Sequence, residues 1–233
     1  MNTKVEPVVA VVVAAGSGSR LGASVPKALV ELGGAPLVWH AVRAMLAGGA
    51  EQVVVTVPAT HHHEFRAALS GLPGVRLVTG GAERQDSVRL GLAALAEEYG
   101  PQAVTLVHDA ARPLTPQHVV RSVVAAVRDG AFAVVPVVEV HDSIRTAEAL
   151  GSRPVDRATL RAVQTPQGAR LGVLQQAHEL IRANGQQVTD DASAVELLGH
   201  QVQLVAGDRE SAKITEPADL LLAEAVVRAR EAT

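Results

Sequence analysis

The sequence of 233 residues contains no cysteine and very few aromatic residues. Without cysteine the chain can form no disulfide, no Cys-ligated zinc site and no thiol nucleophile. This composition fits a reducing compartment, and we expect a cytoplasmic protein. Aromatic residues make up 2% of the chain and hydrophobic residues 48%, so the core must be built from Val, Ala and Leu. Such a core is typical of a buried parallel sheet, whose strands are nearly continuous aliphatic runs.

The chain also lacks an excess of positive charge and a long hydrophobic run. Its formal net charge is -3, which gives no general attraction to nucleic acid or to an anionic membrane. We therefore expect neither partner, and any anion site must be a local cluster of Arg and Lys. No apolar stretch is long enough to cross a bilayer. The apolar run at residues 8–14 ends before Gly16 and has no basic region directly before it, so we interpret it as a first strand rather than a signal peptide.

Strand and helix patterns alternate along the chain. This alternation implies βαβ crossovers, and it predicts an α/β fold of three layers, α/β/α, with a mostly parallel twisted sheet. No linker or repeat divides the chain, so residues 1–233 are expected to form a single domain. The expected strands are 8–14, 52–57, 75–78, 103–108, 132–138 and 202–205, and the expected helices are 37–47, 62–69, 86–97, 116–128, 171–183, 192–198 and 217–230.

The alternation is interrupted between residues 139 and 164. Two extended segments, 140–147 and 156–163, are joined by a turn at 150–154. We interpret them as a hairpin arm, at about 139–164, that projects from the sheet. An arm that cannot bury its own surface usually packs on a partner, which predicts a homodimer formed through the arm.

A glycine-rich loop follows the first strand, with the sequence Ala-Ala-Gly-Ser-Gly-Ser-Arg-Leu-Gly at residues 14–22. Open α/β sheets bind ligands at this position, and glycines let backbone N–H groups approach phosphate oxygens. Arg20 and Lys27 add positive charge, so we favour a phosphate site over a plain turn. Two familiar loops do not match. Leu21 stands where a dinucleotide fingerprint has its last glycine, and Lys27 follows Pro26 instead of the glycine of a P-loop.

The loop, followed by Pro-Lys, resembles the signature loop of nucleotidyltransferases that activate sugars and polyols. Four further runs strengthen the resemblance, and together they are similar to the 2-C-methyl-D-erythritol 4-phosphate cytidylyltransferases of the non-mevalonate isoprenoid pathway. The resemblance implies a Rossmann-like nucleotidyltransferase fold that binds CTP, a polyol phosphate and Mg²⁺. These runs are Val-His-Asp-Ala-Ala-Arg-Pro at 107–113, Gln-Thr-Pro-Gln at 164–167, Thr-Asp-Asp-Ala-Ser at 189–193 and Lys-Ile-Thr at 213–215.

The resemblance also implies roles for individual residues. Asp109 would bind Mg²⁺, a role that suits a carboxylate at the end of a strand facing a phosphate loop. Ala82 stands where the family often has an acidic residue, so a side-chain contact to the nucleotide is lost there. The implied catalytic cations around the triphosphate are Arg20, Lys27 and Lys213, and the implied nucleotide-binding residues are Ala14, Ala15, Gly16, Gly18, Gly81 and Ser87.

The implied polyol phosphate site includes residues of the arm. Ser143 replaces a threonine that the family usually has, so that the hydroxyl is kept and the methyl group is lost. In the family Arg157 comes from the other subunit, and a dimer would then complete each site. The implied substrate-binding residues are Arg112, Ser143, Arg157, Thr165 and Thr189.

Structural interpretations stand beside these roles. Asp109 could cap a helix and pair with Arg112, and Arg157 could pair with Asp156 or another local acid. The segment 80–87 could be a turn and helix start, with Asp86 or Ser87 as the cap. The run of three histidines at 61–63 is best explained as solvated, because adjacent histidines at a helix start do not converge on one ion.

The chemistry expected from the resemblance needs no protein nucleophile. A phosphate monoester has a second pKa of about 6 and is already an anion at neutral pH. This agrees with the absence of a Ser-His-Asp or Cys-His pattern. Two alternatives remain: a cytidylyltransferase for ribitol 5-phosphate, whose motifs overlap, and a non-catalytic nucleotide-binding regulator. Sugar-1-phosphate uridylyl- and guanylyltransferases fit less well, since they lack the run at 108–113.

Overall fold

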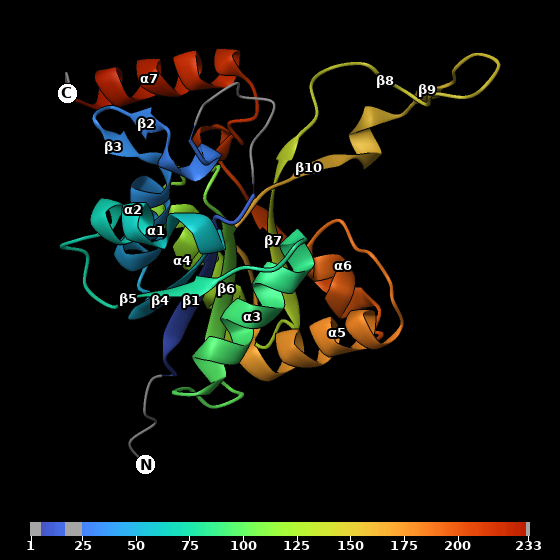
Figure 1. Ribbon diagram of the computed structural model, residues 1–233. Coiled ribbons are helices and arrows are strands. Elements are labelled where there is room, and N and C mark those ends of the chain that lie inside the picture. The colour runs from blue at the N-terminus through green and yellow to red at the C-terminus, as the bar shows by residue number, and fades with distance from the viewer. Residues whose placement is uncertain (1–5, 17–24, 232–233) are drawn as a thin grey trace.

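The computed structural model describes residues 6–16 and 25–231, and a mixed sheet lies at its centre (Figure 1). The strand order is β10-β7-β11-β6-β1-β4-β5, and β12, which is not part of this order, pairs in parallel with β7. Pairing is parallel except where β10 and β11 meet their neighbours. The strands are β1 Val8–Val13, β4 Gln52–Val57, β5 Val75–Thr79, β6 Val104–Asp109, β7 Ala133–Glu139, β10 Arg161–Val163, β11 Gln167–Arg170 and β12 Val202–Ala206.

Helices cover both faces of the sheet, and β1 shows how the sequence achieves this. Its side chains alternate between two apolar layers: Val8, Ala10 and Val12 pack in one core, and Val9 and Val11 in the other. Both sets are buried, as the continuous valine run requires. The first core contains α1 (Leu37–Ala47), α2 (His62–Ala68) and α4 (Gln117–Arg128), and the second contains α3 (Arg84–Ala96), α5 (Leu171–Ala183) and α6 (Asp191–Glu196).

The predicted three-layer fold is therefore confirmed. The bounds of the expected helices and strands outside the arm agree with the structure to within two residues, as the ranges above show. None of the helices in the described part of the chain is both long and apolar enough to cross a membrane.

A third apolar cluster joins the C-terminal helix to the segment after the glycine-rich loop. Helix α7 (Pro217–Glu231) packs on a small hairpin, β2 (Glu31–Leu32) and β3 (Ala35–Pro36), as Figure 1 shows at the top. Ile214 is buried in this cluster, and its N–H group donates to the carbonyl of Ala111 at 2.9 Å. This contact holds the preceding Lys213 at the end of β6.

Strand β11 was not predicted, and it changes the sheet. It runs antiparallel between β6 and β7. Its sequence, Gln-Gly-Ala-Arg, has no β-branched residue and gives little strand signal. Packing explains the glycine: a Cβ at Gly168 would lie 2.4 Å from a methyl group of Val123 on α4. The small residues of β11 therefore leave room for helix α4, which packs over the strand.

The arm projects from the sheet, but its pairing differs from the predicted hairpin. Strand β8 (Ile144–Arg145) pairs with β9 (Pro154–Val155) (Figure 1), and a single bridge between Glu148 and Gly151 continues this pairing toward the tip of the arm. The expected extended segment at 156–163 was wrong in part. Residues 157–159 form a short 3-10 helix, capped by the carboxylate of Asp156, which accepts from the N–H of Ala158 at 3.0 Å. Residues 161–163 leave the arm and join the main sheet as β10.

Candidate active site

A cavity of about 240 Å³ lies at the carboxyl ends of β1 and β6. It is where the parallel strands of an open sheet are expected to bind a ligand. Val13 pairs with both Thr56 and Asp109, so β1, β4 and β6 end level with one another. The predicted residues that line the cavity are Ala14, Ala15, Gly16, Lys27, Gly81, Ser87, Asp109 and Lys213.

These eight residues come from segments that are far apart in the sequence, so the structure brings the predicted nucleotide site together. Two predicted residues, Gly18 and Arg20, lie outside the described part of the chain. Arg84 also lines the cavity, and sequence reasoning missed it.

The loop after β5 touches the loop after β1, and glycine makes this approach possible. A Cβ at Gly80 would lie 2.5 Å from the Cβ of Ala15, and one at Gly81 would lie 2.3 Å from the Cβ of Asp86. The buried hydroxyl of Ser87 accepts from the N–H of Gly81 at 3.1 Å and donates to the carbonyl of Glu83 at 3.2 Å. Ser87 thereby closes the loop on which the cavity wall is built.

Helix α3 starts directly at the cavity wall. Glu83 is its N-cap and forms a capping box with Asp86. The interpretation of 80–87 as a turn and helix start is therefore correct, but the expected caps, Asp86 or Ser87, were wrong, because the helix begins two residues earlier and Glu83 is its N-cap. This local structure is compatible with a ligand site, because residues of the same segment line the cavity.

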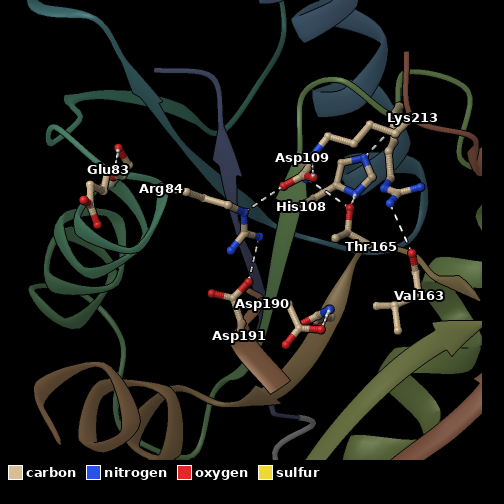
Figure 2. Close-up of polar contacts among 12 residues, drawn as sticks. Glu83, Arg84, His108, Asp109, Val163, Thr165, Asp190, Asp191 and Lys213 are labelled. Carbon is tan, nitrogen blue, oxygen red and sulfur yellow. Dashed lines mark hydrogen bonds and ion pairs between the residues drawn. The ribbon is translucent and has the colours of Figure 1, made fainter. Parts of the chain in front are cut away.

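Two cations hold the carboxylate of Asp109 (Figure 2). Arg84 Nε donates to Oδ1 at 3.1 Å, and Lys213 Nζ donates to Oδ2 at 2.8 Å. The Asp109 side chain is 11% exposed. Burial alone would raise its pKa, but the positive charges of Arg84 and Lys213 outweigh burial and hold the pKa well below its usual range. Asp109 is therefore an anion at neutral pH.

Arg84 is itself held from its other side. Its Nη2 donates to Asp191 Oδ2 at 2.8 Å, and His178 Nε2 bonds the second oxygen, Oδ1, at 3.1 Å. Burial lowers the pKa of Arg84, while the two carboxylates, Asp191 foremost, raise it by more. Its charge is permanent. Two sequence features could have indicated this ion pair: Arg84 follows the glycine pair at 80–81, and Asp191 is the second aspartate of the run at 189–193.

His108 and Thr165 fix the backbone at the end of β6. Burial is the main cause that lowers the pKa of His108, to about 4, so the ring is neutral at neutral pH. Its Nε2 faces the carbonyl of Arg112 at 3.1 Å and must carry the proton, because a carbonyl only accepts. Nδ1 then accepts from the Thr165 hydroxyl at 2.9 Å, and that hydroxyl accepts from the N–H of Asp109 at 3.1 Å.

The glutamines on either side of Thr165 connect two further loops to the site. Gln164 exchanges two hydrogen bonds with the backbone of Asp208, at 2.8 and 3.1 Å. Gln167 donates to Asp190 Oδ2 at 3.0 Å and accepts from the N–H of Ala192 at 2.8 Å. The Gln-Thr-Pro-Gln run is thus a structural junction beneath the cavity.

A family model for 2-C-methyl-D-erythritol 4-phosphate cytidylyltransferase (IspD) matches residues 8–229. The chain belongs to this family. It is 51% identical to the 2-C-methyl-D-erythritol 4-phosphate cytidylyltransferase of Saccharopolyspora erythraea, over 94% of this chain and 99% of that protein. The enzyme of the same name from Streptomyces coelicolor is 48% identical, over 95% and 85% of the two chains.

Solved structures agree with this assignment. The crystal structure of 2-C-methyl-D-erythritol 4-phosphate cytidylyltransferase from Thermus thermophilus superposes with a TM-score of 0.81 at 35% identity, covering 95% of this chain and 99% of that one. As a member of the cytidylyltransferase family the chain is an enzyme of the nucleotidyltransferase class, which confirms the predicted fold and class.

The residues that the cytidylyltransferase resemblance assigns to the polyol phosphate are more dispersed. None of the five lines the cavity. Arg112 is half-buried and donates to the carbonyls of Ser211, at 2.8 Å, and Val163, at 3.2 Å. Thr189 is exposed just before α6.

Thr165 is buried beside His108, as described above, and the other two, Ser143 and Arg157, are both exposed on the arm. Arg157 donates to the carbonyl of His141 and not to Asp156.

The alternative interpretation of Asp109 is also wrong. Asp109 pairs with Arg84 and Lys213 and ends a strand, so it is neither a helix cap nor an ion-pair partner of Arg112.

Asp109 is the residue best placed to hold a metal in this cytidylyltransferase. In the described ranges, residues 6–16 and 25–231, His, Cys, Asp and Glu form no group of three that could chelate an ion. Mg²⁺ is commonly held by one or two carboxylates together with substrate phosphates. One ionised carboxylate beside a phosphate loop fits a magnesium ion that arrives with the triphosphate. The histidines at 61–63 do not converge: His62 bonds Thr79 at 2.9 Å and His61 bonds Thr60 at 2.7 Å.

Proposed function

We propose that the chain transfers CMP from CTP to 2-C-methyl-D-erythritol 4-phosphate, giving 4-diphosphocytidyl-2-C-methyl-D-erythritol and pyrophosphate for isoprenoid precursor synthesis. The observation that carries the proposal is the convergence of Lys27, Arg84 and Lys213 on one cavity, in which Arg84 and Lys213 hold the carboxylate of Asp109. Three cations beside the carboxylate of Asp109 and the helix cap Glu83, at the end of a parallel sheet, suit a triphosphate and its metal, and the family assignment supplies the base and the acceptor.

The cavity walls suggest how CTP lies. The backbone of residues 14–16 and Lys27 would hold the phosphates, as glycine-rich loops after a first strand do. Gly81 and Ser87, on the opposite wall, would face the cytosine. Because the N–H of Gly81 and the hydroxyl of Ser87 already bond each other, we expect Ser87 chiefly to set the shape of the wall.

The reaction is one displacement at phosphorus. An oxygen of the polyol phosphate attacks the α-phosphorus of CTP, a new P–O bond forms, and the bond to the β-phosphate oxygen breaks as pyrophosphate leaves. The obstacle is repulsion between two polyanions, so fixed positive charge and positioning supply the catalysis. Lys213, whose side chain is 42% exposed, can turn from Asp109 toward the α-phosphate, and Arg20 would add charge from the same loop as Lys27.

Asp109 would hold Mg²⁺ in this proposal. When bound, the ion would offset negative charge on the bridging oxygens of the triphosphate. Each carboxylate oxygen of Asp109 keeps a lone pair for the ion, because Oδ1 accepts one hydrogen bond from Arg84 and Oδ2 accepts one from Lys213.

The polyol would bind beside Asp109, toward Thr165 and Thr189. The Thr165 hydroxyl donates to His108 and accepts from the N–H of Asp109, which leaves one lone pair that could accept from a hydroxyl group of the polyol. Arg112 would approach the phosphate group. Ser143 and Arg157 stand apart on the arm, and we propose that they serve the site of a second subunit in a homodimer. The cytoplasmic location stays a prediction.

A substrate matrix tests the proposal. Each of the four nucleoside triphosphates is combined with 2-C-methyl-D-erythritol 4-phosphate or ribitol 5-phosphate, with and without Mg²⁺, and pyrophosphate release is measured. We expect release only with CTP, Mg²⁺ and the methylerythritol phosphate. Faster release with ribitol 5-phosphate would establish the alternative acceptor. Tight CTP binding without release under any condition would indicate a non-catalytic regulator.

A further inference from the structure

A buried chain of polar contacts runs from helix α5 to the cavity. His178 on α5 bonds Asp191 on α6, Asp191 bonds Arg84 on α3, and Arg84 bonds Asp109 on β6, with distances of 3.1, 2.8 and 3.1 Å. Figure 2 shows Arg84 lying between the carboxylates of Asp109 and Asp191. Four elements that are distant in sequence thus meet through two carboxylates and one guanidinium.

Asp191 and His178 lie behind the cavity. Both side chains are 1% exposed, and neither residue lines the cavity. A charged carboxylate at this depth is costly unless each oxygen has a partner. Here Oδ1 has His178 and Oδ2 has Arg84. Because Asp191 does not line the cavity, its most direct link to the reaction is the hydrogen bond that it accepts from Arg84.

Arg84 needs such support. An arginine side chain has several rotatable bonds, and a guanidinium that lines an open cavity can adopt many positions. Carboxylates on two sides restrict the planar group to one position, since its donors have a fixed geometry. Lys213 differs: it is 42% exposed and reaches Asp109 with a single point charge. Arg84 is therefore the anchored partner of Asp109, and Lys213 the exchangeable one.

We propose that Asp191 and His178 are positioning residues that hold Arg84 against Asp109 while Lys213 moves to the substrate. The proposal rests on the proposed function for the step that it serves. Asp191 fixes Arg84, Arg84 fixes the carboxylate that receives the metal and nucleotide, and His178 completes the partners of Asp191. Loss of an outer partner of this kind typically lowers metal affinity or activity by about 10–100-fold.

The test is a double-mutant cycle on Asp191 and Arg84. Asp191→Asn keeps the shape of the side chain and removes its charge, and we expect the turnover number to fall by about tenfold or more. In the Arg84→Met background the same substitution should change turnover by less than about twofold, because its most direct link to the site has gone. Independent, multiplying effects would overturn the proposal.

Three further variants separate positioning from simple loss of structure. His178→Gln can keep a donor near the position of Nε2, so it should retain more activity than His178→Leu. Glu179→Gln makes the same carboxylate-to-amide change on the exposed face of α5, where Glu179 pairs with Arg182, and should leave turnover unchanged. Equal losses in the Gln and Leu variants would contradict the role of His178. Circular dichroism checks folding, and the His178 pair carries the test if Asp191→Asn does not fold.

A measurement that does not depend on turnover distinguishes a failure of the positioning role from a failure of the proposed function. The Nε–H resonance of Arg84, assigned by its absence in Arg84→Met, should be protected from solvent exchange in the wild-type protein and exchange faster in Asp191→Asn. An unchanged resonance would overturn the positioning role. If the wild-type protein releases no pyrophosphate, the proposed function fails, and the behaviour of this resonance alone decides whether Asp191 positions Arg84.

Discussion

The ammonium group of Lys213 lies 2.8 Å from Oδ2 of Asp109, although 104 residues separate them in the sequence. The neighbouring Ile214 is fixed by its buried side chain and by its backbone bond to Ala111. The backbone of Lys213 is thus anchored at the cavity, while its side chain is partly exposed. In the proposed function, this combination would let one lysine pair with Asp109 before the nucleotide binds and with a phosphate afterwards.

The first prediction concerns the two lysines of the cavity. Lys213→Ala and Lys27→Ala should each lower turnover by about a hundredfold or more, because a charge that stabilises the transition state is lost. The fold should persist, since both side chains lie at the cavity and outside the apolar cores. Steady-state pyrophosphate release measures the effect.

Arg121→Ala is a suitable control for the loss of one cation. Arg121 is exposed on α4, where it bonds Gln117, and its removal should leave turnover within about twofold. Near-normal turnover in both lysine variants would discard the assignment of these residues to the reaction.

The second prediction concerns the close contact between the two glycine loops. Gly80→Ala would place a Cβ 2.5 Å from that of Ala15 and 2.8 Å from the Ser87 hydroxyl. The loops must then separate, and we expect CTP affinity to fall by about tenfold or more, as overpacking costs about 1–3 kcal/mol. Gly100→Ala meets no atom within 4 Å and serves as the matched control. Calorimetric titration with CTP compares the two, and equal affinities would show that the contact does not shape the site.

The third prediction concerns pH and the start of helix α7. Asp219 accepts from the hydroxyl of Thr215 at 2.6 Å and from the N–H groups of Thr215 and Glu216 at 2.7 and 2.9 Å. The Thr215 hydroxyl, followed by these N–H groups, lowers the pKa of Asp219 below its ordinary value of 3.8. A lowered folded-state pKa stabilises the protein above the unfolded-state value, and that stabilisation is lost as the pH falls through the folded-state value.

Asp219→Asn keeps an acceptor oxygen but removes the charge, and should therefore reduce the free energy of unfolding by about 0.5–1 kcal/mol at pH 7, as expected for an acidic side chain lost from the first turn of a helix. The difference from the wild-type protein should shrink as the pH falls below 3.8. Urea unfolding at pH 7 and at about pH 3 measures both values. Asp142→Asn, a change at an exposed carboxylate of the arm, should have little effect at either pH. A difference for Asp219→Asn that is the same at both pH values would contradict this account.

Much of the fold follows from local sequence patterns. The valines of β1 are buried on both faces, and a continuous aliphatic run is a direct signal of such a strand. Helices α1 and α5 have the bounds that their apolar spacing predicts. Strand β11 has no comparable signal, because the contact of Gly168 with Val123 selects a small residue that propensity alone would place in a turn.

The candidate site also contains parts that the sequence predicts and parts that it does not. The loop at 14–16 and the position of Asp109 follow from strand ends, which a sequence can place. The contact of Arg84 with Asp191 spans 107 residues and depends on how α3 packs beside α6, which no local pattern encodes. The arm was predicted as an element, yet the departure of β10 into the main sheet depends on its pairing with β7.

The last prediction concerns the arm and a second subunit. Arg157 and Ser143 are exposed and do not line the cavity of their own chain. If Arg157 completes the site of a partner, Arg157→Ala and Lys213→Ala should each be nearly inactive alone. In a mixed dimer one site would combine an intact cavity with an intact arm, and the other would carry both defects. Equal mixing and random exchange should therefore restore about one quarter of wild-type activity, because half of the dimers are mixed and each has one working site. Activity that stays at the level of the separate variants, with subunit exchange verified by differently tagged chains, would place Arg157 in its own subunit's site or outside the reaction.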